Sequence, residues 1–455
     1  MPKLFLCLLL SCVLVARANE VKLEGVSALP GYPVRVLVYD DLISGWQVEL
    51  ASTTSDFKGS FALRFSLRQP AWITLAVAQY RADLFAVPGG KYMVQTEMKR
   101  GESAAFYDPP PLSVKTLSAA DGGLSDAIAM ANVVYNAFVV EHFNALYRLQ
   151  QTKLIDTLRQ VLRRTIPDVD HQYFKDYVFY KVASLEPAVR KLSPSLVYER
   201  FFKNRPVLAD QPEYVSLLRE TFKNYLIQHK LWTQQEYAEA LTKGWKAFDK
   251  LLQRDTMLAE NRAFRELLVL IHFAEHFHHP LHRSADLSRL LSTIAATSPV
   301  PEHARIAANI IRKAERLLPG SYAPRLLLRD ESGTTLEINE SAPAMLLIFV
   351  GPDCRYCEYE LLQLREIHGR MGRQFKFVTI SLHESRQHYR SIHQRNKLDW
   401  PVFSLGSDYR LLDAYDAKVF PHYVILMPGA KIGMVPAPPT DQRLEQHLQR
   451  LARQL

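Results

Sequence analysis

A Cys-x-x-Cys pair that closely follows an apolar run is the feature that most constrains the fold of this 455-residue chain. The continuous apolar stretch from Met345 to Val350 is expected to form a central strand buried on both faces. Cys354-Arg355-Tyr356-Cys357 follows almost at once, and the sequence after it predicts a helix that ends near Met371. The fold must therefore place two thiols where a buried strand passes into a helix.

The first 18 residues have the pattern of a secretory signal peptide. A basic start precedes an apolar run from Leu4 to Val15, and Ala16-Arg17-Ala18 is a small-x-small cleavage site. The run Leu9-Leu10-Ser11-Cys12 is similar to a bacterial lipobox, although apolar residues continue beyond the cysteine. We therefore predict an exported, periplasmic protein, with a lipid anchor at Cys12 in the envelope as the alternative.

Cysteine usage indicates redox chemistry. Two of the four cysteines lie in the predicted signal peptide, which leaves only Cys354 and Cys357 in the mature chain. A disulfide stabilises a fold more when it closes a longer loop, because it then removes more entropy from the unfolded chain. Closing two residues stabilises little, so we interpret the pair as a reactive dithiol. Half of a zinc site is the alternative, but tetrahedral zinc needs four ligands and the sequence has no second cysteine pair.

The remaining sequence predicts a multidomain protein, because 455 residues are too many for one hydrophobic core. Short alternating runs separated by turn residues predict an antiparallel β-sandwich over residues 19–107. A Pro-rich linker at 108–111 precedes apolar residues at helical spacing, so we predict a linker and an all-α region over 108–320. Residues 321–455 return to mixed strands and helices, which predicts a C-terminal α/β domain.

The order strand, Cys-x-x-Cys, helix, strand, helix, strand resembles the thioredoxin superfamily, in particular the TlpA/ResA-like oxidoreductases of the cell envelope. The stretch Pro352-Asp353-Cys354 is similar to that of Bacteroidetes-type members, many of which carry a β-sandwich ahead of the thioredoxin domain. Phe420-Pro421 precedes the last apolar strand, where the family carries its cis-proline. The resemblance covers the C-terminal third of the chain and implies a thioredoxin fold there.

The resemblance also implies the roles of four residues. Cys354 attacks the client sulfur, and Cys357, one helical turn further on, resolves the mixed disulfide. Pro421 lies against the pair, and the backbone of Phe420 binds an extended client segment. The sequence supports the first role independently, since a helix N-terminus favours the thiolate form of a cysteine.

Three neighbours of the cysteines are predicted to tune the thiolate: Arg355, Tyr356 and Asp353. Arg355 adds positive charge, whereas Asp353 opposes thiolate formation if its side chain points at the sulfur. The family often carries a buried acid six residues before the first cysteine, but this chain has Ile348 there. The reduction potential and the direction of electron flow therefore do not follow from the sequence.

A histidine-rich stretch is a second candidate for chemistry. It contains His272, His276, His278, His279 and His282, and the first two lie one helical turn apart. Such a pair can bind zinc or copper. However, Pro280 indicates a helix end, where histidines interact favourably with the helix dipole. We therefore predict no metal site and no cofactor.

The net charge of +9 does not indicate a nucleic-acid partner, because Lys and Arg are spread along the chain and alternate with acids. We predict a periplasmic thiol-disulfide oxidoreductase that exchanges disulfides with client proteins and with an envelope redox partner. The alternative is a non-catalytic envelope scaffold, in which the helical region carries the function and the thioredoxin-fold domain is an adaptor.

Overall fold

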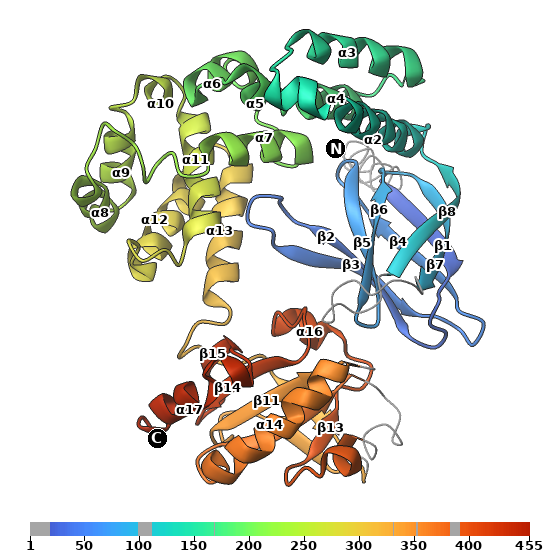
Figure 1. Cartoon of the computed structure of the whole chain (residues 1–455), viewed down its shortest axis with the longest axis vertical. Helices are drawn as coiled ribbons and strands as arrows, with labels where there is room; N and C mark the ends of the chain where they lie inside the picture. Colours follow the sequence, from blue (N-terminus) through green and yellow to red (C-terminus); the bar gives the residue numbers. More distant parts are fainter. Residues whose placement is uncertain (1–18, 99–111, 168, 331, 352–353, 383–391) are drawn as a thin grey trace, which may run out of the picture.

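The computed structural model describes residues 19–98, 112–167, 169–330, 332–351, 354–382 and 392–455. The chain has three parts in sequence order: N-terminal strands, a helical middle and a C-terminal sheet with flanking helices (Figure 1). The predicted multidomain organisation is thereby confirmed. The predicted signal peptide, the linker at 108–111 and Asp353 lie outside the described residues.

The N-terminal part comprises two four-stranded sheets with the strand orders β4-β1-β7-β8 and β3-β2-β5-β6. Side chains from both sheets meet in one buried cluster, because alternate residues of a strand point to the same face. Phe61, Leu63 and Phe65 of β4 join Val34 and Val36 of β2 in this cluster. The strands are β1 (Glu20–Val26), β2 (Pro33–Tyr39), β3 (Gln47–Thr54), β4 (Ser60–Ser66), β5 (Ala71–Val77), β6 (Tyr80–Ala86), β7 (Lys91–Met98) and β8 (Leu112–Ala120).

Two features of this part differ from the sequence-based expectation. β1 pairs with β7 in parallel, so the sheets are not wholly antiparallel. β8 lies in the range that we predicted to hold linker and helices, and it pairs antiparallel with β7 at the sheet edge. Only Leu112 of β8 is buried. Since backbone hydrogen bonds rather than apolar alternation hold this strand, its side-chain pattern does not reveal it.

The middle part is helical, as predicted. Its α8 begins with a capping box, in which Glu236 N donates to Thr233 Oγ1 (3.1 Å) and Thr233 N donates to Glu236 Oε2 (2.8 Å). Within the described ranges, none of the helices is long and apolar enough to cross a membrane. The helices are α2 (Leu124–Glu141), α3 (Lys153–Thr165), α4 (Gln172–Ala183), α5 (Glu186–Arg190), α6 (Pro194–Phe201), α7 (Pro212–Phe222), α8 (Gln234–Lys243), α9 (Trp245–Leu252), α10 (Thr256–Glu260), α11 (Arg262–His276), α12 (Ser284–Thr297) and α13 (Pro301–Glu315), with a π-helical turn at Asn144–Arg148.

The C-terminal part contains a seven-stranded sheet in the order β10-β9-β13-β12-β11-β14-β15. Its strands are β9 (Leu326–Arg329), β10 (Thr335–Ile338), β11 (Met345–Val350), β12 (Lys376–Ser381), β13 (Val402–Ser404), β14 (His422–Met427) and β15 (Lys431–Ala437). Its helices are α14 (Arg355–Met371), α16 (Arg410–Ala414) and α17 (Leu444–Ala452), with a 3-10 turn at Thr440–Gln442.

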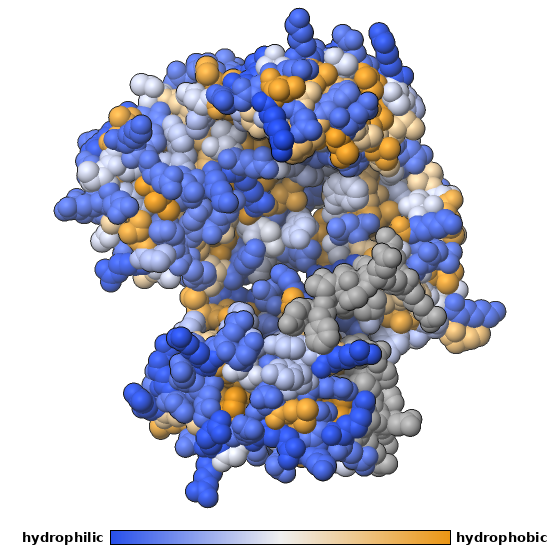
Figure 2. Space-filling model, in the orientation of Figure 1, coloured by the Kyte–Doolittle hydropathy of each residue, from blue (hydrophilic) through white to orange (hydrophobic). Residues whose placement is uncertain are grey.

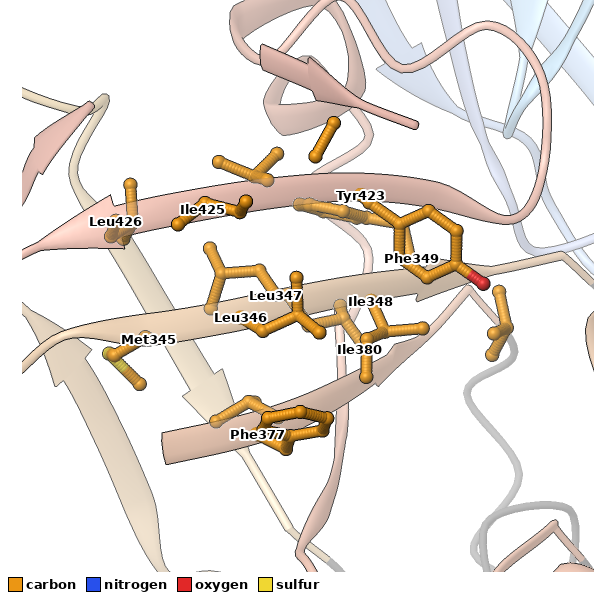
Figure 3. Close-up of a cluster of buried hydrophobic side chains, with 14 of the residues drawn as sticks. Met345, Leu346, Leu347, Ile348, Phe349, Phe377, Ile380, Tyr423, Ile425 and Leu426 are labelled. Carbon is orange, nitrogen blue, oxygen red and sulfur yellow. The ribbon is translucent and has the colours of Figure 1, made fainter. Parts of the chain in front are cut away.

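β11 is an interior strand of this sheet and is buried at every residue. It pairs in parallel with β12 and antiparallel with β14, and its side chains pack with those of both neighbours (Figure 3). A strand that is covered on both faces is expected to be a continuous apolar run. The predicted sequence of buried strand, Cys-x-x-Cys and helix is confirmed.

The hairpin of β2 and β3 connects the N-terminal part to the helical part through its tip. Asp41 is fully buried and accepts hydrogen bonds from Ser44 N (2.6 Å) and from Asn309 Nδ2 of α13 (2.8 Å). Ile43 is buried in the helical core, and Arg219 of α7 donates to its carbonyl oxygen over 2.8 Å. The tip is therefore anchored by a charged acceptor and by an apolar side chain.

The strands of the same hairpin contact the C-terminal part. Arg35 of β2 is 4% exposed and pairs with Asp413 of α16 at 2.8 Å, and Arg81 of β6 also pairs with this carboxylate. Arg410 donates two hydrogen bonds to Glu49 of β3, at 2.9 and 2.7 Å. One hairpin thus holds α16 at its strands and α13 at its tip.

Replacing Asp41 by Ala tests the anchoring of the tip. Hydrogen bonds to a charged group stabilise by about 2 kcal/mol, so we expect the amides of residues 42–46 to exchange roughly 30-fold faster. Hydrogen–deuterium exchange read by mass spectrometry measures this change. The control is Asp399→Ala, which removes an exposed aspartate. Unchanged exchange at 42–46 in the Asp41 variant would show that the carboxylate does not hold the tip.

Candidate active site

The two cysteines lie where β11 passes into α14, and they form a disulfide with an Sγ–Sγ distance of 2.10 Å. Cys354 is the N-cap of α14 and is half-buried, whereas Cys357 in the first turn is only 2% exposed. The backbone N–H of Cys357 donates to Cys354 Sγ over 3.0 Å. A reacting sulfur from solvent therefore reaches Cys354 first, and a backbone donor already points at that sulfur.

The loop before β14 lies against the disulfide. The Phe420–Pro421 peptide bond is cis, and the carbonyl oxygen of Phe420 lies 3.8 Å from Cys354 Sγ. Antiparallel pairing of His422 with Phe349 brings this loop beside the end of β11. The structure therefore brings together the four residues that we predicted for attack, resolution and client binding, while their roles stay predictions.

The structure describes two of the three residues that are predicted to tune the thiolate. Arg355 is exposed at the first position of α14, and Tyr356 is half-buried and stacks on Tyr359 with ring centroids 6.1 Å apart. Asp353 lies outside the described residues. Their effect on the thiolate stays a prediction.

The sequence analysis missed a buried carboxylate close to the pair. Glu360 of α14 is fully buried and accepts hydrogen bonds from Tyr423 Oη (2.7 Å), Thr440 N (2.9 Å) and Thr440 Oγ1 (2.7 Å). Burial, followed by the charge of Glu360, raises the pKa of Tyr423 far above its usual value. The signal was present, because Cys357, Glu360, Leu361 and Leu364 follow helical spacing and form one buried face.

His422, next to the cis-proline, is a buried histidine without a charged partner at hydrogen-bond distance among the described residues. Burial lowers its pKa to about 4. Its Nε2 atom has no hydrogen-bond partner in the described part of the chain. The imidazole is therefore neutral near neutral pH, and it adds no positive charge beside the disulfide.

The histidine-rich stretch forms a cluster at the end of α11, remote in sequence from the cysteines. Tyr237 Oη lies 3.0 Å from the Nε2 atoms of both His272 and His282. Burial, and then the neighbouring histidines, hold the pKa of His272 well below its usual range. In the described ranges, no three His, Cys, Asp or Glu side chains are arranged to hold a metal ion.

Comparisons with known proteins agree with this fold and site. Residues 344–432 match the family described as thioredoxin-like. Over 120 residues, the chain is 26% identical to the thiol-disulfide oxidoreductase ResA of Bacillus subtilis, a match that covers 26% of this chain and 66% of that protein.

Solved structures that the chain matches include the thioredoxin domain of a Bacteroides vulgatus thiol-disulfide oxidoreductase, with 21% identity and a TM-score of 0.28. That match covers 30% of this chain and 99% of the other. A thioredoxin-like protein from Bacteroides caccae has 17% identity and a TM-score of 0.32, over 55% of this chain and 99% of the other.

The fold and the cysteine pair define a thioredoxin-superfamily domain of the thiol-disulfide oxidoreductase class. Within that class, the C-terminal part of the chain is similar to ResA, a TlpA/ResA-like member of the thioredoxin superfamily.

The depressed pKa of His422 predicts a specific acid sensitivity. The unfolded chain, with a histidine pKa of 6.5, binds the proton more tightly than the folded protein with its pKa of about 4. As the pH falls from 6.5 to 4, the unfolded chain takes up this proton first, so the free energy of unfolding decreases by roughly 3 kcal/mol for this group. We expect His422→Gln to lose less stability than the wild type in urea unfolding at pH 4.5 relative to pH 7.

The matched control is His393→Gln, because His393 is an exposed histidine of the same part of the chain. Its stability should follow the wild-type pH dependence. The buried His272 is present in the wild type and in both variants, so its effect on the pH dependence is the same in all three. An unchanged difference between pH 7 and pH 4.5 in the His422 variant would contradict the prediction.

Proposed function

We propose that this protein is exported to the periplasm and exchanges disulfides with client proteins through Cys354 and Cys357. The observation that carries the proposal is the asymmetry of the pair. Cys354 is accessible at the N-terminus of α14, and Cys357 is enclosed one turn further on. An accessible sulfur suits attack, and an enclosed one suits resolution, because a mixed disulfide must be released from inside the site.

Exchange proceeds in two steps that conserve electrons. A client thiolate attacks Cys354 Sγ, which forms a mixed disulfide and breaks the Cys354–Cys357 bond to leave Cys357 as a thiolate. The second client thiolate then attacks the client sulfur of the mixed disulfide. This step forms the client disulfide and releases Cys354 as a thiolate. The client loses two electrons and the pair gains them. The reverse sequence reduces a client disulfide, and an envelope redox partner with a dithiol or disulfide restores the starting state.

The helix supports the thiolate of Cys354 in this scheme. α14 extends over 17 residues, so the positive end of its dipole lies at Cys354. The N–H of Cys357 that donates to this sulfur would stabilise the anion further. Arg355 adds positive charge at the surface, and in this proposal the backbone of Phe420 hydrogen-bonds an extended client segment.

Export is proposed from the signal-peptide pattern of residues 1–18, with a lipid anchor at Cys12 as the alternative. Two parts outside the thioredoxin domain accompany the redox site. We propose that the two N-terminal sheets form a β-sandwich, which the shared buried cluster supports, and that this part and the helices position clients.

Replacing Cys357 by Ser tests exchange, because the variant keeps the attacking thiol and lacks the resolving one. After reduction, we expect Cys357→Ser to accumulate mixed disulfides with envelope proteins and to lose all turnover. Non-reducing electrophoresis with mass spectrometry identifies the trapped partners.

Cys354→Ser is the matched control and should trap nothing. If Cys357→Ser binds partners as the wild type does but forms no mixed disulfide, the exchange proposal fails. The scaffold alternative, with the thioredoxin domain as an adaptor, would then take its place.

A further inference from the structure

A cavity of about 1430 Å³ lies where the three parts of the chain meet. Trp46 and Arg81 of the N-terminal part, Val215 and Lys313 of the helical part, and Asp416 and Phe420 of the C-terminal part contribute to its wall. In Figure 2 the surface is hollowed between the C-terminal part and the rest of the molecule. Phe420 contributes to the wall, and its carbonyl oxygen lies 3.8 Å from Cys354 Sγ, so one wall residue of the cavity is a neighbour of the redox site.

Several carboxylates in this wall are already paired with basic side chains. Asp413 is shared by Arg35 and Arg81, and Glu49 accepts both hydrogen bonds of Arg410. Asp416 pairs with Lys418 at 2.9 Å. These pairs balance the charge where the N-terminal strands meet α16 and the loop after it.

Charge is not balanced at the end of α13. Lys313 Nζ donates to the carbonyl oxygen of Ser44 (2.7 Å), and Arg316 lies over the ring of Trp46 at 5.5 Å. Among the described residues, neither cation has a carboxylate within 4 Å. Arg316 Nε is buried and has no hydrogen-bond partner there.

Desolvation lowers the pKa of both Lys313 and Arg316. The charge of Asp416, which pairs with Lys418, opposes this shift for both cations, and the charge of Asp41 also opposes it for Lys313. Asp83 and Glu220 also line the cavity, so the wall is not positive throughout. In the described part of the wall, the cations without a carboxylate partner are those at the end of α13. Lys313 is exposed and Arg316 is half-buried, so the cost of an unpaired cation falls mainly on Arg316, and an incoming carboxylate relieves this cost.

We propose that this cavity binds an acidic segment of the client polypeptide, with Lys313 and Arg316 pairing with its carboxylates while its cysteine reaches Cys354. The inference rests on the proposed disulfide exchange and names the class of client. A polypeptide is the favoured occupant because the cavity is larger than the roughly 300–1,000 Å³ of sites for small molecules. Phe420 lies in the wall of the cavity and neighbours Cys354, so a polypeptide bound there can extend past Phe420 to the reacting sulfur.

The test uses the reduced mature protein and two cysteine peptides that differ only in Glu or Lys on both sides of the cysteine. Each cysteine is blocked as a thionitrobenzoate disulfide. Attack by Cys354 then releases the coloured thiolate, and stopped-flow absorbance gives the rate. Electrostatic complementarity mainly accelerates association, so we expect the Glu peptide to react about tenfold faster at low salt. The preference should vanish near 1 M salt, where the screening length falls to about 3 Å.

The double variant Lys313→Glu/Arg316→Glu should lose or reverse the preference for the Glu peptide. The control double variant, Lys243→Glu/Lys246→Glu, makes the same charge change at exposed lysines outside the cavity wall and should keep it. Lys313→Gln alone should reduce the preference about threefold, and it provides a milder variant if the double one does not fold. All folded variants should reduce the neutral 2-hydroxyethyl disulfide at the wild-type rate.

The outcomes separate this inference from the proposed function. Equal rates for both peptides, together with normal reduction of 2-hydroxyethyl disulfide, would overturn the acidic-client inference and leave disulfide exchange intact. A preference that survives in the double variant would also overturn it. Failure to reduce any of the three disulfides would contradict the proposed exchange itself.

Discussion

The β2–β3 hairpin is the contact on which the arrangement of the whole molecule depends. Its tip places the buried carboxylate of Asp41 against Asn309 of α13, and its strands present Arg35 and Glu49 to α16. The partners in the Arg35–Asp413 pair are 378 positions apart in sequence. Since burying an arginine is unfavourable without a counter-charge, the domains must meet at this point for Arg35 to be satisfied. The cavity between the three parts, with Phe420 in its wall, is a consequence of that meeting.

The redox chemistry depends on a second arrangement, in which the end of β11 fixes the start of α14. The helix then leaves Cys354 accessible and encloses Cys357 and Glu360 on its buried face. The His422–Phe349 pairing brings the cis-proline loop to the same place from a distant part of the chain. The residues that we propose for attack, resolution and client contact are thus gathered where β11 ends and β14 begins.

Much of this could be predicted from local pattern. The apolar run of β11 and the cysteine spacing were sufficient to expect the strand, the helix and the reactive pair, and Phe420–Pro421 was found from the family resemblance. The edge strand β8 and the parallel pairing of β1 with β7 could not be predicted, because strand pairing is a contact between distant segments. Glu360 was missed although its helical spacing from Cys357 was visible, since a charged residue is usually assigned to the exposed face.

By itself, the sequence determined the redox pair of this protein: two cysteines at a strand-to-helix junction, in a chain with no other cysteine after residue 12. Only the tertiary structure decided which sulfur is accessible, which carboxylate is buried on the same helix face as Cys357 and which cations line the cavity between the three parts. The physical reason is the sequence distance over which each property is set. Periodicity and spacing report what a segment does with its own neighbours, whereas burial and charge pairing depend on which distant segments share a core.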